Sequence, residues 1–213
     1  MIRDSVKIDW ENKQIECYLP TRAAEEEFLS NNISIAVKIL QPQCKKYHND
    51  ESTKEIILKA FDKLLKNKHM IMWDDLDEED RKMIEEKPVN HYIVWRVVFK
   101  LSLSSPARPV FDGSSKTPIT RDSDGVGGGR CLNDLVVKGR VVTLNLTKMV
   151  LRFCIGPAAC QGDLKQFYAS IKLNKRQWNL QRVLFKPDLD PEAEPLEAVI
   201  VTLIWGIKCV SAV

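Results

Sequence analysis

A single carboxylate stands out in the segment AACQGDLKQFYASIKL (residues 158–173). Asp163 follows a short run of small residues that favours a strand, and the residues after it favour a helical turn. A carboxylate at a strand end beside a basic cleft is a candidate ligand for a divalent cation. An aspartate at such a position also commonly caps the turn that follows it. Residue type alone leaves both roles open.

Basic residues are concentrated in the middle of the chain. Residues 1–90 contain 15 Lys and Arg against 19 Asp and Glu, whereas residues 91–186 contain 16 against 5. Clustered cations bind phosphate backbones because binding releases condensed counterions. A solvated basic surface would give the same counts. Charge therefore leaves nucleic-acid binding as one of two interpretations.

Composition places the chain among globular proteins. Its 213 residues are 44% hydrophobic and 29% charged, which excludes collagen, coiled coils and wholesale disorder. The length suits one domain with a smaller lobe. The longest uncharged apolar run, residues 198–206, is far short of the roughly 20 residues that span a bilayer, and the N-terminus has no signal-peptide core. We expect an intracellular protein, cytoplasmic or nuclear, without a membrane partner and with free thiols.

Periodicity predicts several elements. Residues 52–68 have apolar side chains at helical spacing, with Ser52 or Thr53 as the N-cap. The acidic residues at 74–80 are typical of the first turn of another short helix. Residues 91–101 and 107–113 are rich in β-branched and aromatic side chains and predict a two-stranded ribbon.

The second half of the chain is less regular. Residues 112–130 lack apolar periodicity and contain many Gly and Pro, which predicts a mobile loop. An amphipathic helix is expected over 143–154. Strands are expected over 158–163, 181–186 and 196–205. Helices followed by strands interleaved with short helices indicate an α+β fold.

Eight short blocks occur in an order typical of one protein family. They are YLP (18–20), the helix ending near Lys68, RPVFDGSSKT (108–117), CLNDLVVKG (131–139), LRF (151–153), GDLKQFYASI (162–171), QRVLFK (181–186) and IWGIK (204–208). Through these blocks, nearly the whole chain resembles the reverse transcriptase region of BEL/Pao-type long-terminal-repeat retrotransposons.

The resemblance implies a partial right-hand polymerase fold. Residues 1–90 would form an N-terminal, mainly helical connecting segment, and residues 91–213 the fingers and an incomplete palm. The implied partners are an RNA or DNA template–primer and a deoxynucleoside triphosphate. In a full polyprotein of the family, a protease, an RNase H domain and an integrase would be fused to this region.

The resemblance also assigns roles to residues. Asp163 would be the first catalytic aspartate and would hold two Mg²⁺ ions, with the backbone carbonyl of Leu164 as a further metal ligand. Tyr168 would contact the sugar of the incoming nucleotide and exclude a 2′-hydroxyl; otherwise it is a core aromatic. Arg108 would grip the triphosphate; otherwise it is a surface arginine. Gly206 lies in the block that positions the nucleotide and template.

The chain departs from the family pattern in three places. It contains no Tyr-x-Asp-Asp sequence, which would complete the two-metal site. Asp188 and Asp190 do not replace it, since they lie in a proline-rich loop. The block around Gly206 lacks its usual proline. The strand expected before Asp163 contains GPAACQG, which suits a central strand poorly. We therefore expect a reverse transcriptase homologue that is inactive as this chain.

Two alternatives belong to other functional classes. The first is a nucleic-acid-binding remnant without catalysis, in which the basic segment holds a phosphate backbone. The second is a protein-interaction module formed by the helix over residues 52–68 and the acidic segment that follows it.

Overall fold

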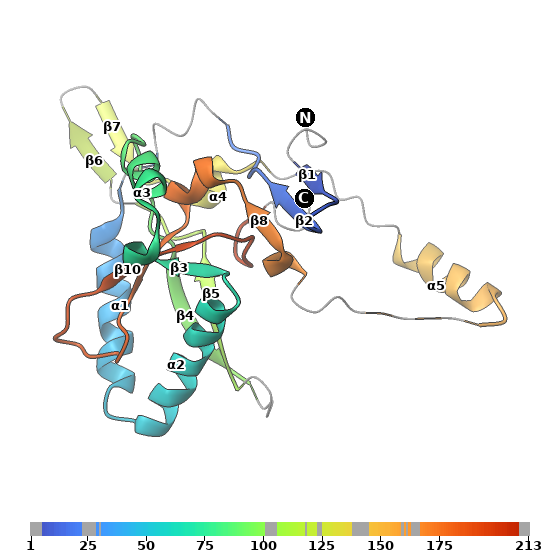
Figure 1. Ribbon diagram of the computed structural model, residues 1–213, viewed down its shortest axis with the longest axis horizontal. Coiled ribbons are helices and arrows are strands. Elements are labelled where there is room, and N and C mark those ends of the chain that lie inside the picture. Colours follow the sequence, from blue (N-terminus) through green and yellow to red (C-terminus); the bar gives the residue numbers. More distant parts are fainter. Residues whose placement is uncertain are drawn as a thin grey trace.

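The computed structural model shows a mixed arrangement of helices and short β-strands (Figure 1). The structure describes residues 6–22, 29, 31–100, 106–117, 119–122, 125–137, 145–158, 160, 162 and 167–208, with the backbone alone at 119–122 and 125–128. In this part of the chain no helix combines the length and the apolar character needed to cross a membrane.

The helices confirm closely the predicted helical segments at 52–68 and 143–154, and in part the acidic one between them. The α-helices are α1 (Ile33–Tyr47), α2 (Glu51–Lys66), α3 (Glu78–Glu85), α4 (Leu132–Leu135) and α5 (Leu146–Ile155), and the 3₁₀ helices are η3 (Trp73–Asp75), η4 (Tyr168–Ser170) and η5 (Lys175–Leu180). Helix α2 matches the predicted helix at 52–68. The acidic segment is confirmed in part: residues 78–80 form the first turn of α3, whereas Asp74 and Asp75 lie in η3. Helix α5 matches the predicted 143–154 from Leu146 onward; residues 143 and 144 lie outside the described residues.

The N-cap predicted for α2 is wrong. The capping residue is Asp50, whose carboxylate accepts a hydrogen bond of 3.0 Å from the backbone N–H of Thr53. The helix begins at Glu51, so Ser52 and Thr53 lie inside its first turn. Asp50 therefore satisfies one of the N–H groups that the start of every helix leaves without a partner.

The strands form two three-stranded sheets and two hairpins. They are β1 (Val6–Asp9), β2 (Gln14–Cys17), β3 (Met70–Met72), β4 (Val94–Phe99), β5 (Ala107–Asp112), β6 (Ile119–Asp122), β7 (Gly125–Gly128), β8 (Ile171–Leu173), β9 (Arg182–Phe185) and β10 (Leu196–Ile200). The sheet orders are β1-β2-β8, β3-β10-β9, β4-β5 and β6-β7, and all pairs are antiparallel except β2 with β8. Strands from both sides of residue 90 share the two larger sheets, and the domain division at that residue stays a prediction.

The predicted β-ribbon is confirmed by β4 and β5. Trp95 lies opposite Phe111 on the face toward the core, and both side chains are buried. On the other face Val98 lies opposite Arg108, and both are exposed. This alternation is expected for a ribbon with one buried face.

The mobile loop predicted at 112–130 is wrong in its middle. Strands β6 and β7 form an antiparallel hairpin there, with Asp122 opposite Gly125. Its base is closed where the N–H of Thr117 donates to the carbonyl of Arg130 at 2.7 Å. Backbone pairing needs no apolar alternation, so the sequence pattern did not indicate it. The predicted strand at 158–163 is described only at residues 158, 160 and 162, and none of these is in a strand.

The core lies between the helices α1 and α2 and the strands β4, β9 and β10 (Figure 1). Phe61 of α2 is fully buried, with its ring centroid 4.5 Å from that of Trp95 and 4.6 Å from that of Phe185. Such aromatic contacts bury large apolar areas and stabilise the fold. Strands β9 and β10 confirm two of the predicted strands, although β10 ends at Ile200.

Candidate functional site

The turn around Gly206 approaches the end of β5 so closely that only glycine fits. Gly206 has a φ of +107°, a conformation that residues with a Cβ rarely adopt. A Cβ atom there would lie 1.9 Å from the carbonyl oxygen of Phe111. A Cβ atom on Gly113 would lie 2.9 Å from the carbonyl oxygen of Gly206. The two glycines therefore allow the turn and the strand end to meet backbone to backbone.

Asn133 fastens these two segments to each other. Its side-chain Nδ2 donates to the carbonyl oxygen of Gly206 at 2.9 Å, and its Oδ1 accepts from the N–H of Lys208 at 2.8 Å. Its own backbone N–H donates to the carbonyl oxygen of Gly113 at 2.9 Å. We call Phe111, Gly113, Asn133, Gly206 and Lys208 the Gly206 junction.

The short helix α4 holds Asn133 in place from its N-terminal side. The carboxylate of Asp134 accepts hydrogen bonds from the N–H of Cys131 at 3.1 Å and from its Sγ at 3.2 Å. These bonds lower the pKa of Asp134, and the positive charges of Lys116 and Arg130 lower it further. Leu132 is completely buried and anchors the helix to the core. Asn133 thus lies in a helix that is capped at its start and anchored by a buried neighbour.

A segment from the start of the chain holds the other end of α4. The N–H of Val137 donates to the carbonyl oxygen of Pro20 at 2.7 Å, and the N–H of Arg22 donates to that of Leu135 at 3.2 Å. The sequence block at 18–20 therefore meets the block at 131–139. Blocks that lie more than a hundred residues apart in the chain are neighbours in the fold.

Tyr168 lies against the same turn. Its ring centroid is 4.4 Å from that of Trp205, in an edge-to-face arrangement, and Trp205 immediately precedes Gly206. Tyr168 is half-buried against the core, whereas Trp205 is 64% exposed. The structure therefore brings two of the predicted nucleotide-binding residues, Tyr168 and Gly206, to one place.

Arg108 lies farther along the ribbon. It is exposed on β5, five residues before Gly113, which corresponds to about 16 Å along an extended strand. Arg108 and Asp112 are on the same outward face of β5, opposite to Phe111. The structure thus places Arg108 on the ribbon that leads to the junction rather than in the junction.

The predicted metal ligands Asp163 and Leu164 lie outside the described residues. Within the described ranges no group of three or more His, Cys, Asp or Glu residues is arranged to hold a metal ion. Asp112 is the carboxylate next to the junction, and it accepts hydrogen bonds from the N–H and the hydroxyl of Ser114. Asp112 therefore caps its own turn, and the Mg²⁺ site at Asp163 stays a prediction.

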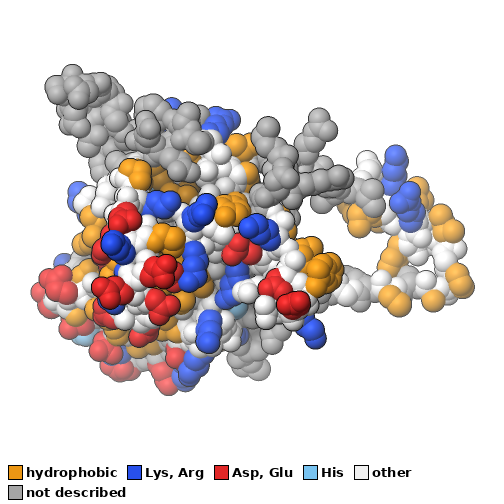
Figure 2. Space-filling view, turned by 45° about the horizontal axis from the view of Figure 1, so that its top comes forward, with side chains coloured by type: hydrophobic (Ala, Val, Ile, Leu, Met, Phe, Trp, Pro, Cys, Tyr) orange, Lys and Arg blue, Asp and Glu red, His pale blue; other side chains and the backbone are white. Residues whose placement is uncertain are grey.

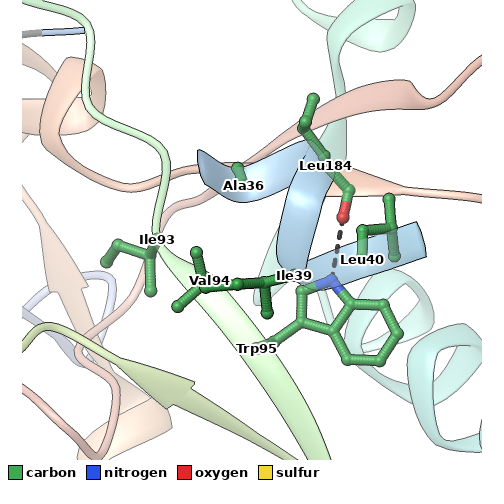
Figure 3. Close-up of a pocket in the computed structure, with 7 residues that line it drawn as sticks. All are labelled: Ala36, Ile39, Leu40, Ile93, Val94, Trp95 and Leu184. Carbon is green, nitrogen blue, oxygen red and sulfur yellow. Dashed lines mark hydrogen bonds between the residues drawn. The ribbon is translucent and has the colours of Figure 1, made fainter. Parts of the chain in front are cut away.

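A separate apolar pocket lies between α1, β4 and β9 (Figure 3). Its residues are Ala36, Ile39, Leu40, Ile93, Val94, Trp95 and Leu184. The cavity has a volume of about 10 Å³, far below the roughly 300–1,000 Å³ of typical ligand pockets. The indole N–H of Trp95 donates to the carbonyl oxygen of Leu184 at 2.8 Å, so its polar atom is satisfied. This pocket is a packing gap in the core.

Sequence reasoning assigned no role to Asn133 or Gly113. Both residues are inside blocks that carry the family resemblance, CLNDLVVKG and RPVFDGSSKT. An asparagine has a donor and an acceptor on one side chain, and a glycine allows close backbone approach. The two residue types were visible in the sequence blocks, but only the fold shows that Asn133 and Gly113 meet.

Comparisons with known proteins give no family assignment. The chain matches none of the protein-family models against which it was scanned. No curated protein matches it either. A functional inference therefore rests on the sequence blocks and on the geometry of the Gly206 junction.

Proposed function

We propose that this chain is a reverse transcriptase homologue of retrotransposon origin, whose family activity is template-directed DNA synthesis by two-metal phosphoryl transfer. One observation carries the proposal: the Gly206 junction joins three of the sequence blocks, residues 108–117, 131–139 and 204–208, and two further blocks contact these three. Pro20 of the block at 18–20 bonds to Val137, and Tyr168 of the block at 162–171 packs against Trp205. The same blocks carry the resemblance to the polymerase family.

The junction has features that suit a deoxynucleotide. Tyr168 offers a half-buried aromatic ring of the kind that can pack against a sugar. Arg108 lies on the β4–β5 ribbon that leads to the junction. From there it would reach toward the triphosphate, since a guanidinium binds phosphate oxygens in a bidentate manner.

The chemistry itself would depend on Mg²⁺. Asp163 and the carbonyl of Leu164 would hold the ion, which when bound neutralises the triphosphate and activates the attacking hydroxyl. The 213 residues contain no Tyr-x-Asp-Asp sequence for the opposite side of a two-metal site. Because electrostatic stabilisation carries most of phosphoryl transfer, we expect this chain to bind nucleotide without extending a primer.

Nucleotide titration tests the proposal. The purified chain is titrated with Mg²⁺-dNTP and with the matching ribonucleotide, and binding is followed by calorimetry. We expect the deoxynucleotide to bind more tightly, and Tyr168→Ala to reduce that preference, while Tyr168→Phe retains it because the ring remains. Phe153→Ala on α5 is the control and should change neither affinity. No affinity for either nucleotide would overturn the proposal.

A second candidate function is nucleic-acid binding without catalysis, and the exposed charge favours it. Two basic residues are buried in the described part of the segment 91–186: Arg182 pairs with Glu197, and the ammonium group of Lys186 donates to the carbonyl oxygen of Pro191. Many of the others are exposed, namely Arg96, Lys100, Arg108, Lys116, Arg130, Lys148, Arg152, Lys175 and Arg176. In Figure 2, Lys and Arg side chains gather in the middle of the visible face, beside an acidic area.

Salt dependence tests this second candidate. Neutralisation of phosphates by Lys and Arg makes affinity for a primer–template duplex fall steeply with salt. The logarithm of the association constant falls linearly with the logarithm of the salt concentration, with a slope of about −0.9 for each phosphate contacted. We expect the chain to bind a duplex at low salt with such a slope. Duplex binding without any nucleotide binding would favour the second candidate over the first, and no binding at low salt would exclude it.

The described structure does not favour the protein-interaction module. The apolar face of α2 is already covered, because Ile57 and Phe61 are both fully buried. Asp80, in the acidic segment, is paired within the chain to Lys175 at 2.6 Å. The apolar face of the helix over 52–68 is thus buried against the core of the same chain.

A further inference from the structure

Asn133 is the only side chain among the described residues that bonds to the Gly206 turn at two points. It donates to the carbonyl oxygen of Gly206 and accepts from the N–H of Lys208, two residues later. Its backbone N–H at the same time binds Gly113. One residue therefore connects the end of the ribbon to a turn that follows Asn133 by 73 residues in the chain.

The amide group is the chemistry that this position requires. Gly206 offers a carbonyl acceptor and Lys208 an N–H donor, and an amide supplies the complementary donor and acceptor together. A carboxylate could accept from Lys208 but would place an oxygen against the Gly206 carbonyl. An alanine would leave both backbone groups without these partners.

The turn in turn positions the aromatic pair. Trp205 immediately precedes Gly206, and its ring contacts that of Tyr168 at a centroid distance of 4.4 Å. No side chain separates Gly206 from the carbonyl of Phe111, and the two bonds from the Asn133 side chain tie the turn to this position. A change at Asn133 therefore reaches Tyr168 through the turn and Trp205.

We propose that Asn133 is a positioning residue for the deoxynucleotide site: it holds the Gly206 turn, and through Trp205 the Tyr168 ring, in register with the end of β5. The inference rests on the proposed function and deepens it, because it concerns how the same site discriminates between sugars. Asn133 itself contacts no nucleotide in this role. Its loss should lower the preference for deoxyribose more than it lowers affinity for a nucleic-acid backbone.

The test compares three variants in the full 213-residue chain. Asn133→Ala removes both side-chain bonds, and Asn133→Asp keeps the shape and the acceptor but loses the donor. Asn145→Ala, at the start of α5, is the matched control. The measured quantities are dissociation constants for Mg²⁺-dNTP, for the matching ribonucleotide and for a primer–template duplex.

We expect both Asn133 variants to lose about tenfold in the ratio of deoxynucleotide to ribonucleotide affinity, in keeping with one or two hydrogen bonds lost. Duplex affinity should stay within about twofold, since phosphate contacts are spread over many residues. The Lys208 amide should exchange with solvent faster in Asn133→Ala. The Asn145→Ala control should have the same three dissociation constants as the unmodified chain.

The outcomes separate the two proposals. If the unmodified chain binds nucleotide and both Asn133 variants keep its sugar preference, the positioning role is overturned and the proposed function stands. A parallel loss of nucleotide and duplex binding in both variants would show general structural damage and would also overturn it. If the unmodified chain binds no nucleotide, the proposed function fails, and the role of Asn133 fails with it.

Discussion

Helices α2 and α5 have the same kind of sequence pattern and opposite surroundings. Both are amphipathic, and each has a side-chain N-cap, Asp50 for α2 and Asn145 for α5. In α2 the apolar side is covered, with Ile57 and Phe61 fully buried. All ten residues of α5 are exposed, and the helix stands apart from the rest of the described structure (Figure 1).

The difference shows how far local periodicity reaches. The apolar stripe of α5 contains Leu146, Met149, Val150 and Phe153, spaced as on one helix face, yet each is between 48% and 74% exposed. Periodicity predicts that a helix forms and which of its faces is apolar. It does not say what covers that face, because the covering residues come from distant parts of the chain. We call the described residues outside α5 the body. The same kind of substitution should therefore change the stability of the protein when it is made in the body, and change it little when it is made in α5.

Removing a phenylalanine from each helix gives the largest expected contrast. Phe61→Ala should lower the free energy of unfolding by about 3–5 kcal/mol, because a fully buried ring leaves a cavity. Phe153→Ala should change it by less than about 0.5 kcal/mol, since that side chain is 54% exposed. Urea unfolding measures both. An equal loss in the two variants would mean that α5 is covered in solution, and the comparison would be wrong.

Two glycines extend the contrast beyond the helices. Gly206→Ala should cost about 3 kcal/mol, because its φ is positive and its Cβ would collide with the carbonyl oxygen of Phe111. Gly162→Ala, in the segment after α5, should cost little, since no atom lies within 4 Å of its added Cβ. Thermal unfolding compares the two. A harmless Gly206→Ala would contradict the close approach on which the junction depends.

Acid should destabilise the body through His91. This imidazole is completely buried, neither ring nitrogen has a hydrogen-bond partner within the described structure, and burial lowers its pKa to about 4. Between pH 6.5 and 4 the unfolded chain binds a proton that the folded chain does not. Stability should therefore fall by about 3 kcal/mol in total as the pH drops through that window.

The variant His91→Leu isolates this effect. It removes the titrating group and fills the site with an apolar side chain, so the stability between pH 6.5 and 5 should become nearly flat. Lowered pKa values at Asp50 and Asp134 also make stability fall in acid, but mainly below this range. Urea unfolding at several pH values provides the slope. A slope that persists in His91→Leu would assign the acid sensitivity to other groups.

The sequence predicted the elements whose causes are local. Helix α2 and the β4–β5 ribbon follow from periodicity and from β-branched composition, and α3 from its acidic first turn. Helix α1 was not predicted, and it contains Pro42, a residue that usually ends a helix. Packing overrides that rule here: Leu40 and Cys44 are buried, and the side chain of Gln43 donates to the carbonyl oxygen of Trp95.

The long-range pairings could not be predicted in the same way. Strand β2 pairs with β8, where Ile15 lies opposite Ile171, and β3 pairs with β10. None of these short strands has a sequence feature that identifies the strand with which it pairs. The candidate site shows the same division: the family resemblance named Tyr168 and Gly206, whereas the role of Asn133 follows only from hydrogen bonds that connect distant segments.

The smallest expected effect comes from the two N-caps, and it tests the comparison most directly. Asp50 accepts from the N–H of Thr53 at 3.0 Å and from its hydroxyl at 2.6 Å. Asn145 accepts from the N–H of Thr147 at 3.0 Å and from that of Lys148 at 3.4 Å, so each substitution removes two hydrogen bonds. Asp50→Ala should lower the melting temperature by about 3 °C, because α2 unfolds together with the core.

Asn145→Ala should leave the melting temperature unchanged and reduce only the helical signal in circular dichroism. A ten-residue helix without packing partners is marginal in water, so its cap decides whether it forms and has no bearing on the rest of the molecule. The circular dichroism spectrum and the melting curve of each variant separate the two effects. If both variants lowered the melting temperature equally, α5 would have to unfold cooperatively with the body, which requires an apolar surface in contact with its exposed stripe.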